Sequence, residues 1–107
     1  MAGSEPECRR ISRAILPAVR ASIAEIMYSR YRWRQQRIAD GLGVAQVAIS
    51  KYLNGRYSKE VLKMKNYIRD NGLGNEIAKR LAQGRDKSEV HSRIDGLCTE
   101  IIQRGVA

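Results

Sequence analysis

Apolar residues recur along the chain at steps of three and four, the spacing that places them on one face of an α-helix. The first such stretch runs from Ile11 to Met27 and is interrupted by Pro17, which either begins a second helix or kinks one long helix. Five more helices are expected, over about 34–42, 45–54, 59–70, 75–83 and 88–104. The last three of these helices are expected to start at a polar residue: Ser58, Asn75 and Ser88. Because no segment alternates convincingly with the period of a strand, the pattern predicts an all-α protein.

The stretch Gln35–Gly55, with the sequence QQRIADGLGVAQVAISKYLNG, contains two short apolar patterns on either side of a glycine. Gly43 stands where the first helix ends and the chain turns sharply, a position that favours a positive φ. Ala39 is small where the two helices would cross most closely. The inner face would consist of Ile38, Leu42, Val44, Ile49 and Tyr52 or Leu53. These features predict a helix-turn-helix, with two helices crossing at about 90–120°.

This stretch resembles the helix-turn-helix of the Cro and phage-repressor (Xre-type) family, through the pattern QxxIAxxLGVxxxxISxYLxG. Together with Cys8 and the stretch LPAVRASIAEIMYSRY (Leu16–Tyr31), it looks like a group of small archaeal transcriptional regulators. The same motif precedes thiamine-phosphate synthase domains in some archaeal fusion proteins, but no such domain is expected here. The resemblance covers about Pro6–Lys59 and implies a λ-repressor-like DNA-binding domain with a C-terminal helical extension. We therefore expect a disordered tail over residues 1–6, a DNA-binding domain over 7–71 and C-terminal helices over 72–107.

The second helix of the motif is the expected recognition helix, whose N-terminal end enters the major groove. Its outward residues are Gln46, Val47, Ser50 and Lys51, which are the expected base-reading residues. A glutamine matches the N6/N7 edge of adenine, a lysine reaches a guanine or a phosphate, and a valine contacts a thymine methyl group. The resemblance also implies base reading at Gln46, Val47 and Lys51.

A second set of residues is expected to contact DNA phosphates. The resemblance implies this role for Gln35 at the start of the first motif helix and for Asn54 and Arg56 at the end of the second. Basic residues that flank the motif are expected to add contacts: Arg34, Arg37, Lys59 and Lys63.

Positive charge is concentrated in the middle of the chain. The net charge is +9, and residues 28–69 contain ten Lys and Arg against two acids, a net of +8. A local field of this kind attracts polyphosphate partners. Charge alone is equally consistent with a solvated basic surface, but together with the motif it favours double-stranded DNA as the partner.

Two other kinds of nucleic-acid protein remain open. An architectural or nucleoid protein coats DNA through charge alone, and an RNA-binding or antitoxin-like module uses the same motif. The polar outer face formed by Gln46, Ser50 and Lys51 favours a sequence-specific transcriptional regulator. Because the chain contains no Ser-His-Asp, paired-carboxylate or Gly-rich phosphate pattern, neither an enzyme nor a cofactor is expected.

Aromatic residues alternate with arginines just before the motif. Tyr28, Tyr31 and Trp33 stand among Arg30, Arg32 and Arg34. Such a cluster could stack on the bases of a single strand. The favoured interpretation is that Tyr31 and Trp33 close the core at the first turn of the motif.

The last predicted helix carries an apolar stripe at three- and four-residue spacing, formed by Ile94, Leu97, Cys98, Ile101 and Ile102. Val90 extends it by one turn. A stripe of this size must be covered, either by the first helix of the same chain or by a second copy. We favour a homodimer, because two-fold pairing doubles the DNA site that one motif reads and makes it palindromic.

Three residues are candidates for metal or redox chemistry: Cys8, His91 and Cys98. The cysteines lie 90 residues apart without zinc-site spacing, so a reduced pair and no metal are expected. His91 and Cys98 share a helical face, and a partial metal site with Cys8 is the alternative.

No apolar run approaches the roughly 20 residues that span a bilayer, and the polar N-terminus does not resemble a signal peptide. We therefore expect a cytoplasmic, nucleoid-associated protein.

Overall fold

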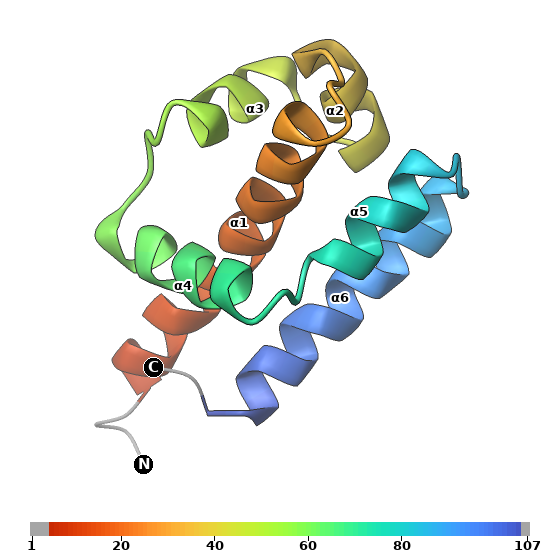
Figure 1. The fold of residues 1–107 in the computed structure, drawn as a ribbon. Helices are drawn as coiled ribbons and strands as arrows, with labels where there is room; N and C mark the ends of the chain where they lie inside the picture. The colour runs from red at the N-terminus through yellow and green to blue at the C-terminus, as the bar shows by residue number, and fades with distance from the viewer. Residues whose placement is uncertain (1–4, 106–107) are drawn as a thin grey trace.

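The structure is a computed structural model that describes the backbone of residues 5–105 and the side chains of residues 13–105. Within that range it contains six helices and no strand: α1 (Glu5–Ser29), α2 (Gln35–Leu42), α3 (Gln46–Leu53), α4 (Lys59–Asp70), α5 (Asn75–Ala82) and α6 (Lys87–Gln103) (Figure 1). The predicted all-α class is confirmed for this part of the chain. The expected tail over residues 1–6 lies outside the described residues, except for residues 5 and 6, which belong to α1.

Helix α1 is the central element of the fold. It is one helix of 25 residues that contains Pro17, so the chain forms no separate second helix at this proline. Ile15, Val19, Ile23 and Met27 lie one or two turns apart on α1 and are fully buried. Helix α1 contacts every other helix: α2 and α3 lie at one of its ends, and α5 and α6 run along one of its sides (Figure 1). The motif is therefore supported by a long helix that precedes it in the sequence.

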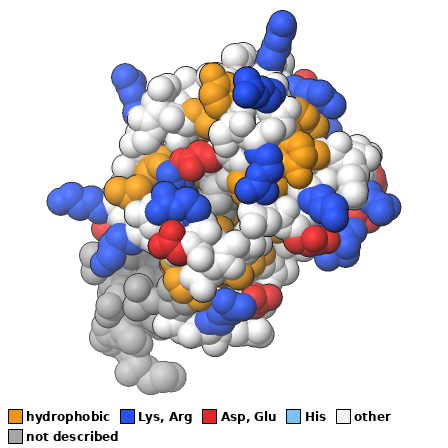
Figure 2. Space-filling view, viewed as in Figure 1, with side chains coloured by type: hydrophobic (Ala, Val, Ile, Leu, Met, Phe, Trp, Pro, Cys, Tyr) orange, Lys and Arg blue, Asp and Glu red, His pale blue; other side chains and the backbone are white. Residues whose placement is uncertain are grey.

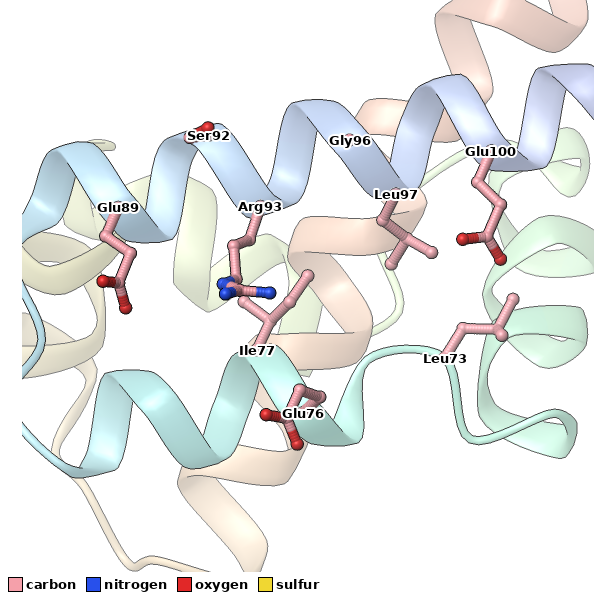
Figure 3. Close-up of a pocket in the computed structure, with 9 residues that line it drawn as sticks. All are labelled: Leu73, Glu76, Ile77, Glu89, Ser92, Arg93, Gly96, Leu97 and Glu100. Atoms are coloured by element: carbon pink, nitrogen blue, oxygen red, sulfur yellow. The ribbon is translucent and has the colours of Figure 1, made fainter.

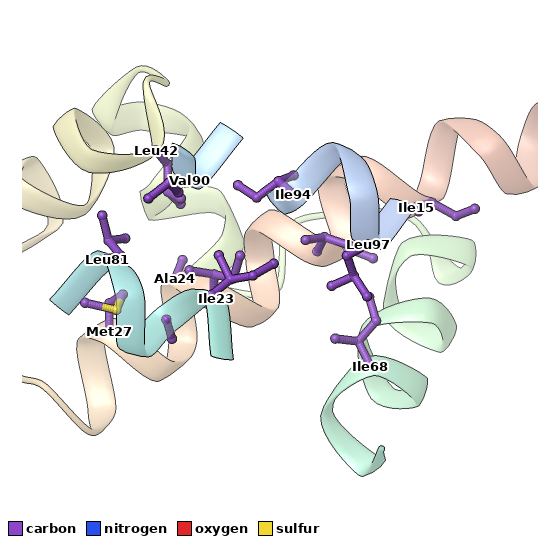
Figure 4. Packing of buried hydrophobic residues seen from close by; sticks show 14 of the residues in the cluster. Ile15, Ile23, Ala24, Met27, Leu42, Ile68, Leu81, Val90, Ile94 and Leu97 are labelled. Atoms are coloured by element: carbon purple, nitrogen blue, oxygen red, sulfur yellow. The ribbon is translucent and has the colours of Figure 1, made fainter. Parts of the chain in front are cut away.

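One hydrophobic core joins the first four helices to the last two (Figure 4). Helix α6 contributes Val90, Ile94, Leu97 and Ile101, all of which are buried within the single chain. It contacts α1, α2 and α5. The expectation that this stripe pairs two copies of the chain is therefore wrong, because the stripe is already covered by the chain's own helices.

The other two residues of the predicted dimer surface lie beside this buried face. Cys98 is half-buried, and burial together with the nearby Asp95 carboxylate raises the pKa of its thiol. Ile102 is 54% exposed. Neither residue extends the buried stripe into a broad free apolar surface.

Glycines and polar caps end and begin the helices largely as the sequence indicates. Ser58 caps α4, and its hydroxyl accepts a hydrogen bond of 3.2 Å from the Val61 N–H. The expected start of α5 at Asn75 is confirmed, whereas α6 begins at Lys87, one residue before the expected Ser88, with Asp86 in the N-cap position. Within the described residues, no helix is both long and apolar enough to cross a membrane.

Candidate nucleic-acid interface

A three-residue turn, Gly43–Ala45, connects α2 to α3. Gly43 adopts φ 69° and ψ 34°, in the left-handed region that glycine enters without strain. The Val44 N–H then donates a 3.0 Å hydrogen bond to the Ala39 carbonyl and closes the end of α2. The predicted role of Gly43 is confirmed.

The inner face of the two helices also matches the prediction. Ile38, Ala39, Leu42 and Ile49 are at most 1% exposed. The remaining inner residues, Val44, Tyr52 and Leu53, are half-buried and pack against the same core. Burial of this face fixes which side chains of α3 point outward.

Helix α6 contacts the turn through a residue that sequence reasoning did not place there. The Nε2 atom of His91 lies 3.1 Å from the Leu42 carbonyl oxygen, so the imidazole donates to the last residue of α2. A Cβ added at Gly43 would lie 3.0 Å from the same ring. Since His91 and Leu42 are 49 positions apart in the sequence, no local pattern indicates this contact.

The outer face of α3 presents three of the four predicted base-reading residues. Gln46, Val47 and Lys51 are exposed, and Val47, at 62%, is the most exposed of the large apolar side chains that the structure describes. Ser50 differs from the prediction: it is half-buried, and its hydroxyl oxygen lies 3.3 Å from the Asn54 side-chain amide. The same amide donates to the Ser50 carbonyl at 2.9 Å. Ser50 and Asn54 are therefore partly occupied with each other at the end of α3.

The beginning of α3 has free hydrogen-bond donors. Its N-cap residue, Ala45, offers no side chain to the first-turn N–H groups. Arg34 precedes α2 in the same way, without a capping hydrogen bond from its side chain. Uncapped helix starts carry partial positive charge and favour anions nearby.

Exposed basic residues surround these two helices: Arg34, Arg37, Lys51, Arg56, Lys59 and Lys63. Arg37 lies with its guanidinium 3.9 Å from the centroid of the Trp33 ring. Among the described side chains, none of the six has an acidic group within 4.0 Å; the ion pairs lie at Lys65–Glu25, at Arg69–Asp70 and within residues 76–104. In Figure 2, several Lys and Arg side chains project from the upper and left margins, the part of the view that contains α2, α3 and the following loop. We call these six residues the unpaired basic set.

Lys65 belongs to the same charged segment of the sequence but has a different role. Its side chain is buried and forms an ion pair with Glu25 of α1. Burial by itself lowers the pKa of Lys65, but the hydrogen bonds to Glu25 and Tyr57 outweigh it and raise the pKa above its ordinary value. Lys65 therefore holds α4 against α1 as a cation and is not available to DNA.

A separate open cavity of about 580 Å³ lies between α5 and α6 (Figure 3). Glu76, Glu89 and Glu100 line it, with Arg93 as its one basic residue. The three glutamates are already paired with Arg80, Arg85 or Arg104. The cavity therefore lacks the cluster of unpaired positive charge that surrounds α2 and α3.

The possible metal ligands are not brought together among the described side chains. His91 binds the Leu42 carbonyl, and no group of three His, Cys, Asp or Glu side chains is found there. The Cys8 side chain lies outside the described residues.

Comparison of the chain with models of protein families, with curated proteins and with solved structures finds no match.

Proposed function

We propose that the protein is a sequence-specific DNA-binding regulator of transcription that inserts α3 into the major groove. One observation carries this proposal: the exposed polar side of α3 is bordered by six basic side chains without acidic partners among the described residues. Elsewhere in the described part of the chain, Lys65, Arg69, Arg80, Arg85 and Arg104 form ion pairs, and the cations without an acidic partner there, such as Lys79 and Arg93, do not border a helix-turn-helix. Cations left unpaired around a helix-turn-helix are suited to phosphates.

In this proposal the start of α3 reads the bases. The side-chain amide of Gln46 pairs with the N6/N7 edge of adenine, and Val47 contacts a thymine methyl group. Lys51 lies one turn further along the helix and reaches a guanine or a phosphate. The free N–H groups of the first turn favour an approaching phosphate.

The residues around α3 fix its orientation on the duplex. Arg34, Gln35 and Arg37 lie at the start of α2, and Asn54, Arg56, Lys59 and Lys63 follow α3 along the chain. Contacts to phosphates position a protein without reading sequence. Such a regulator would act at the nucleoid, in the cytoplasm.

The proposal is tested by measuring duplex binding as a function of salt. Six phosphate contacts give a log–log slope of about −5, at roughly 0.9 per contact. Lys63→Gln is expected to reduce the slope by about 1. Lys79→Gln is the matched control, because Lys79 is exposed on α5 and loses the same charge outside the interface.

Two results would contradict the proposal: absence of duplex binding at low salt, or equal effects of the Lys63 and Lys79 substitutions. Binding with the expected slope but equal affinity for every sequence would instead indicate an architectural protein that recognises charge alone. Preference for RNA over a DNA duplex would indicate an RNA-binding module.

A further inference from the structure

A second basic and aromatic surface lies at the corner where α1 ends and α2 begins. It encloses an open cavity of about 430 Å³ that is lined by Tyr28, Ser29, Arg32, Trp33 and Arg34. We call this cavity the corner pocket. No acidic residue lines it. Of its residues, only Arg34 belongs to the DNA interface proposed above.

The two aromatic residues of the corner pocket differ in how they are held. Trp33 packs partly against the core, and Arg37 covers its ring at 3.9 Å. Tyr31 also packs against the core, so the expected core-closing role of Tyr31 and Trp33 is confirmed. Tyr28 is not part of the core and is 51% exposed. The pocket therefore combines a fixed indole, whose ring Arg37 covers, with an exposed phenol on which a flat ligand can stack.

The backbone at Arg32 is strained. Arg32 has φ 60°, and it is the one non-glycine residue with a positive φ in the described part of the chain. It follows the last turn of α1, at a place where helices commonly use glycine to enter the left-handed region. Residues held in this sparsely populated region cluster at functional sites. Neither Arg32 nor Arg34 has an acidic group within 4.0 Å among the described side chains.

We propose that the corner pocket binds one nucleotide, with the base stacked on the exposed ring of Tyr28, beside Trp33, and the phosphate between Arg32 and Arg34. Both halves of the ligand are matched: an exposed aromatic ring recognises the base, and guanidinium groups bind phosphate through paired hydrogen bonds. The cavity volume falls within the usual range for small-molecule sites, about 300–1,000 Å³. The nucleotide is either free or part of a single strand, since both present the same chemistry. This site does not depend on duplex binding by α3.

Trp33 allows the proposal to be tested directly, because it is the single tryptophan of the chain. The full chain is titrated with adenosine monophosphate while the tryptophan fluorescence is recorded, and calorimetry checks the affinity. Adenosine and ribose 5-phosphate serve as half-ligands, and each is expected to bind at least tenfold more weakly. A short deoxyadenosine oligomer that binds at least tenfold more tightly than the mononucleotide identifies a single strand as the source. Equal affinity identifies a free nucleotide.

Two substitutions separate binding from folding. Arg32→Gly removes the guanidinium but relieves the positive φ, so the melting temperature should stay the same or rise while nucleotide affinity falls at least tenfold. Tyr28→Ala should also weaken the nucleotide at least tenfold and leave duplex binding by α3 unchanged. Lys79→Gln controls for the loss of one positive charge and should change neither nucleotide affinity nor duplex binding. The proposal is overturned if no probe binds, or if the Arg32 and Tyr28 variants retain full affinity.

Discussion

Replacing Gly43 with alanine tests the turn of the motif and its contact with α6 in one experiment. At φ 69°, any residue with a Cβ is strained, and the added Cβ would lie 3.0 Å from Cε1 and Nε2 of His91. That ring also donates to the Leu42 carbonyl, at 3.1 Å. The substitution therefore strains the backbone and displaces the imidazole that binds the end of α2.

The expected loss of stability has two parts. A left-handed backbone conformation costs a residue other than glycine about 1–2 kcal/mol. Loss of the hydrogen bond from His91 adds about 0.5–1.5 kcal/mol. Gly43→Ala should therefore lower the free energy of unfolding by about 1.5–3.5 kcal/mol. Gly84→Ala is the matched control, because Gly84 has φ 78° and no atom lies within 4 Å of an added Cβ.

Urea unfolding followed by circular dichroism measures both variants, together with His91→Ala and the Gly43–His91 double variant. Gly84→Ala should lose only the backbone part, about 1–2 kcal/mol. The double variant should lose less than the sum of the single variants, because both remove the same contact. Equal losses at Gly43 and Gly84, with additive effects at His91, would refute the proposed contact. Unchanged stability of Gly43→Ala would refute the turn itself.

Two further predictions concern the core and its buried ion pair. Leu97→Asp should lower the free energy of unfolding by at least about 3 kcal/mol in thermal melts, whereas Ile102→Asp at the exposed neighbouring site should change it by less than about 0.5 kcal/mol; a Leu97 variant that keeps its melting temperature and only dissociates a dimer would contradict the fold. Glu25→Gln should cost about 1–3 kcal/mol at neutral pH, because it leaves the Lys65 ammonium without its partner. Since the folded-state pKa of Lys65 is raised, its ion pair with Glu25 stabilises the fold fully at pH values below the ordinary lysine pKa of 10.5. This stabilisation is lost as the pH rises through the folded-state pKa of Lys65. The free energies of unfolding of the wild type and of Glu25→Gln should therefore converge at high pH. A constant difference between them there would contradict the Lys65–Glu25 ion pair.

Local patterns in the sequence were sufficient to predict the helices and the inner face of the motif. Four glycines with a positive φ follow helix ends: Gly43, Gly55, Gly72 and Gly84. The ends of these helices could therefore be predicted from the positions of the glycines in the sequence. Ile38 and Ile49 are fully buried because three- and four-residue spacing places them on facing sides of α2 and α3. These predictions depend only on neighbours within one or two helical turns.

The partner of each surface could not be predicted in the same way. The stripe that includes Leu97 had to be covered, but an amphipathic pattern does not say whether the cover is α1 or a second chain. The Lys65–Glu25 and His91–Leu42 contacts join residues 40 and 49 positions apart, so they follow from the packing of helices and not from spacing. Ser50 was placed outward by helical geometry, but the amide of Asn54, one turn later, covers its hydroxyl.

Selection of bound duplexes from a random pool, by the wild-type protein and by Gln46→Ala, tests the central claim most directly. The wild type is expected to enrich a defined sequence. The variant should lose its preference at particular base pairs, a change of about 1–3 kcal/mol there, and keep its affinity for unrelated DNA. Enrichment of no sequence by the wild type, or of the same sequence by both proteins, would show that α3 does not read bases through Gln46.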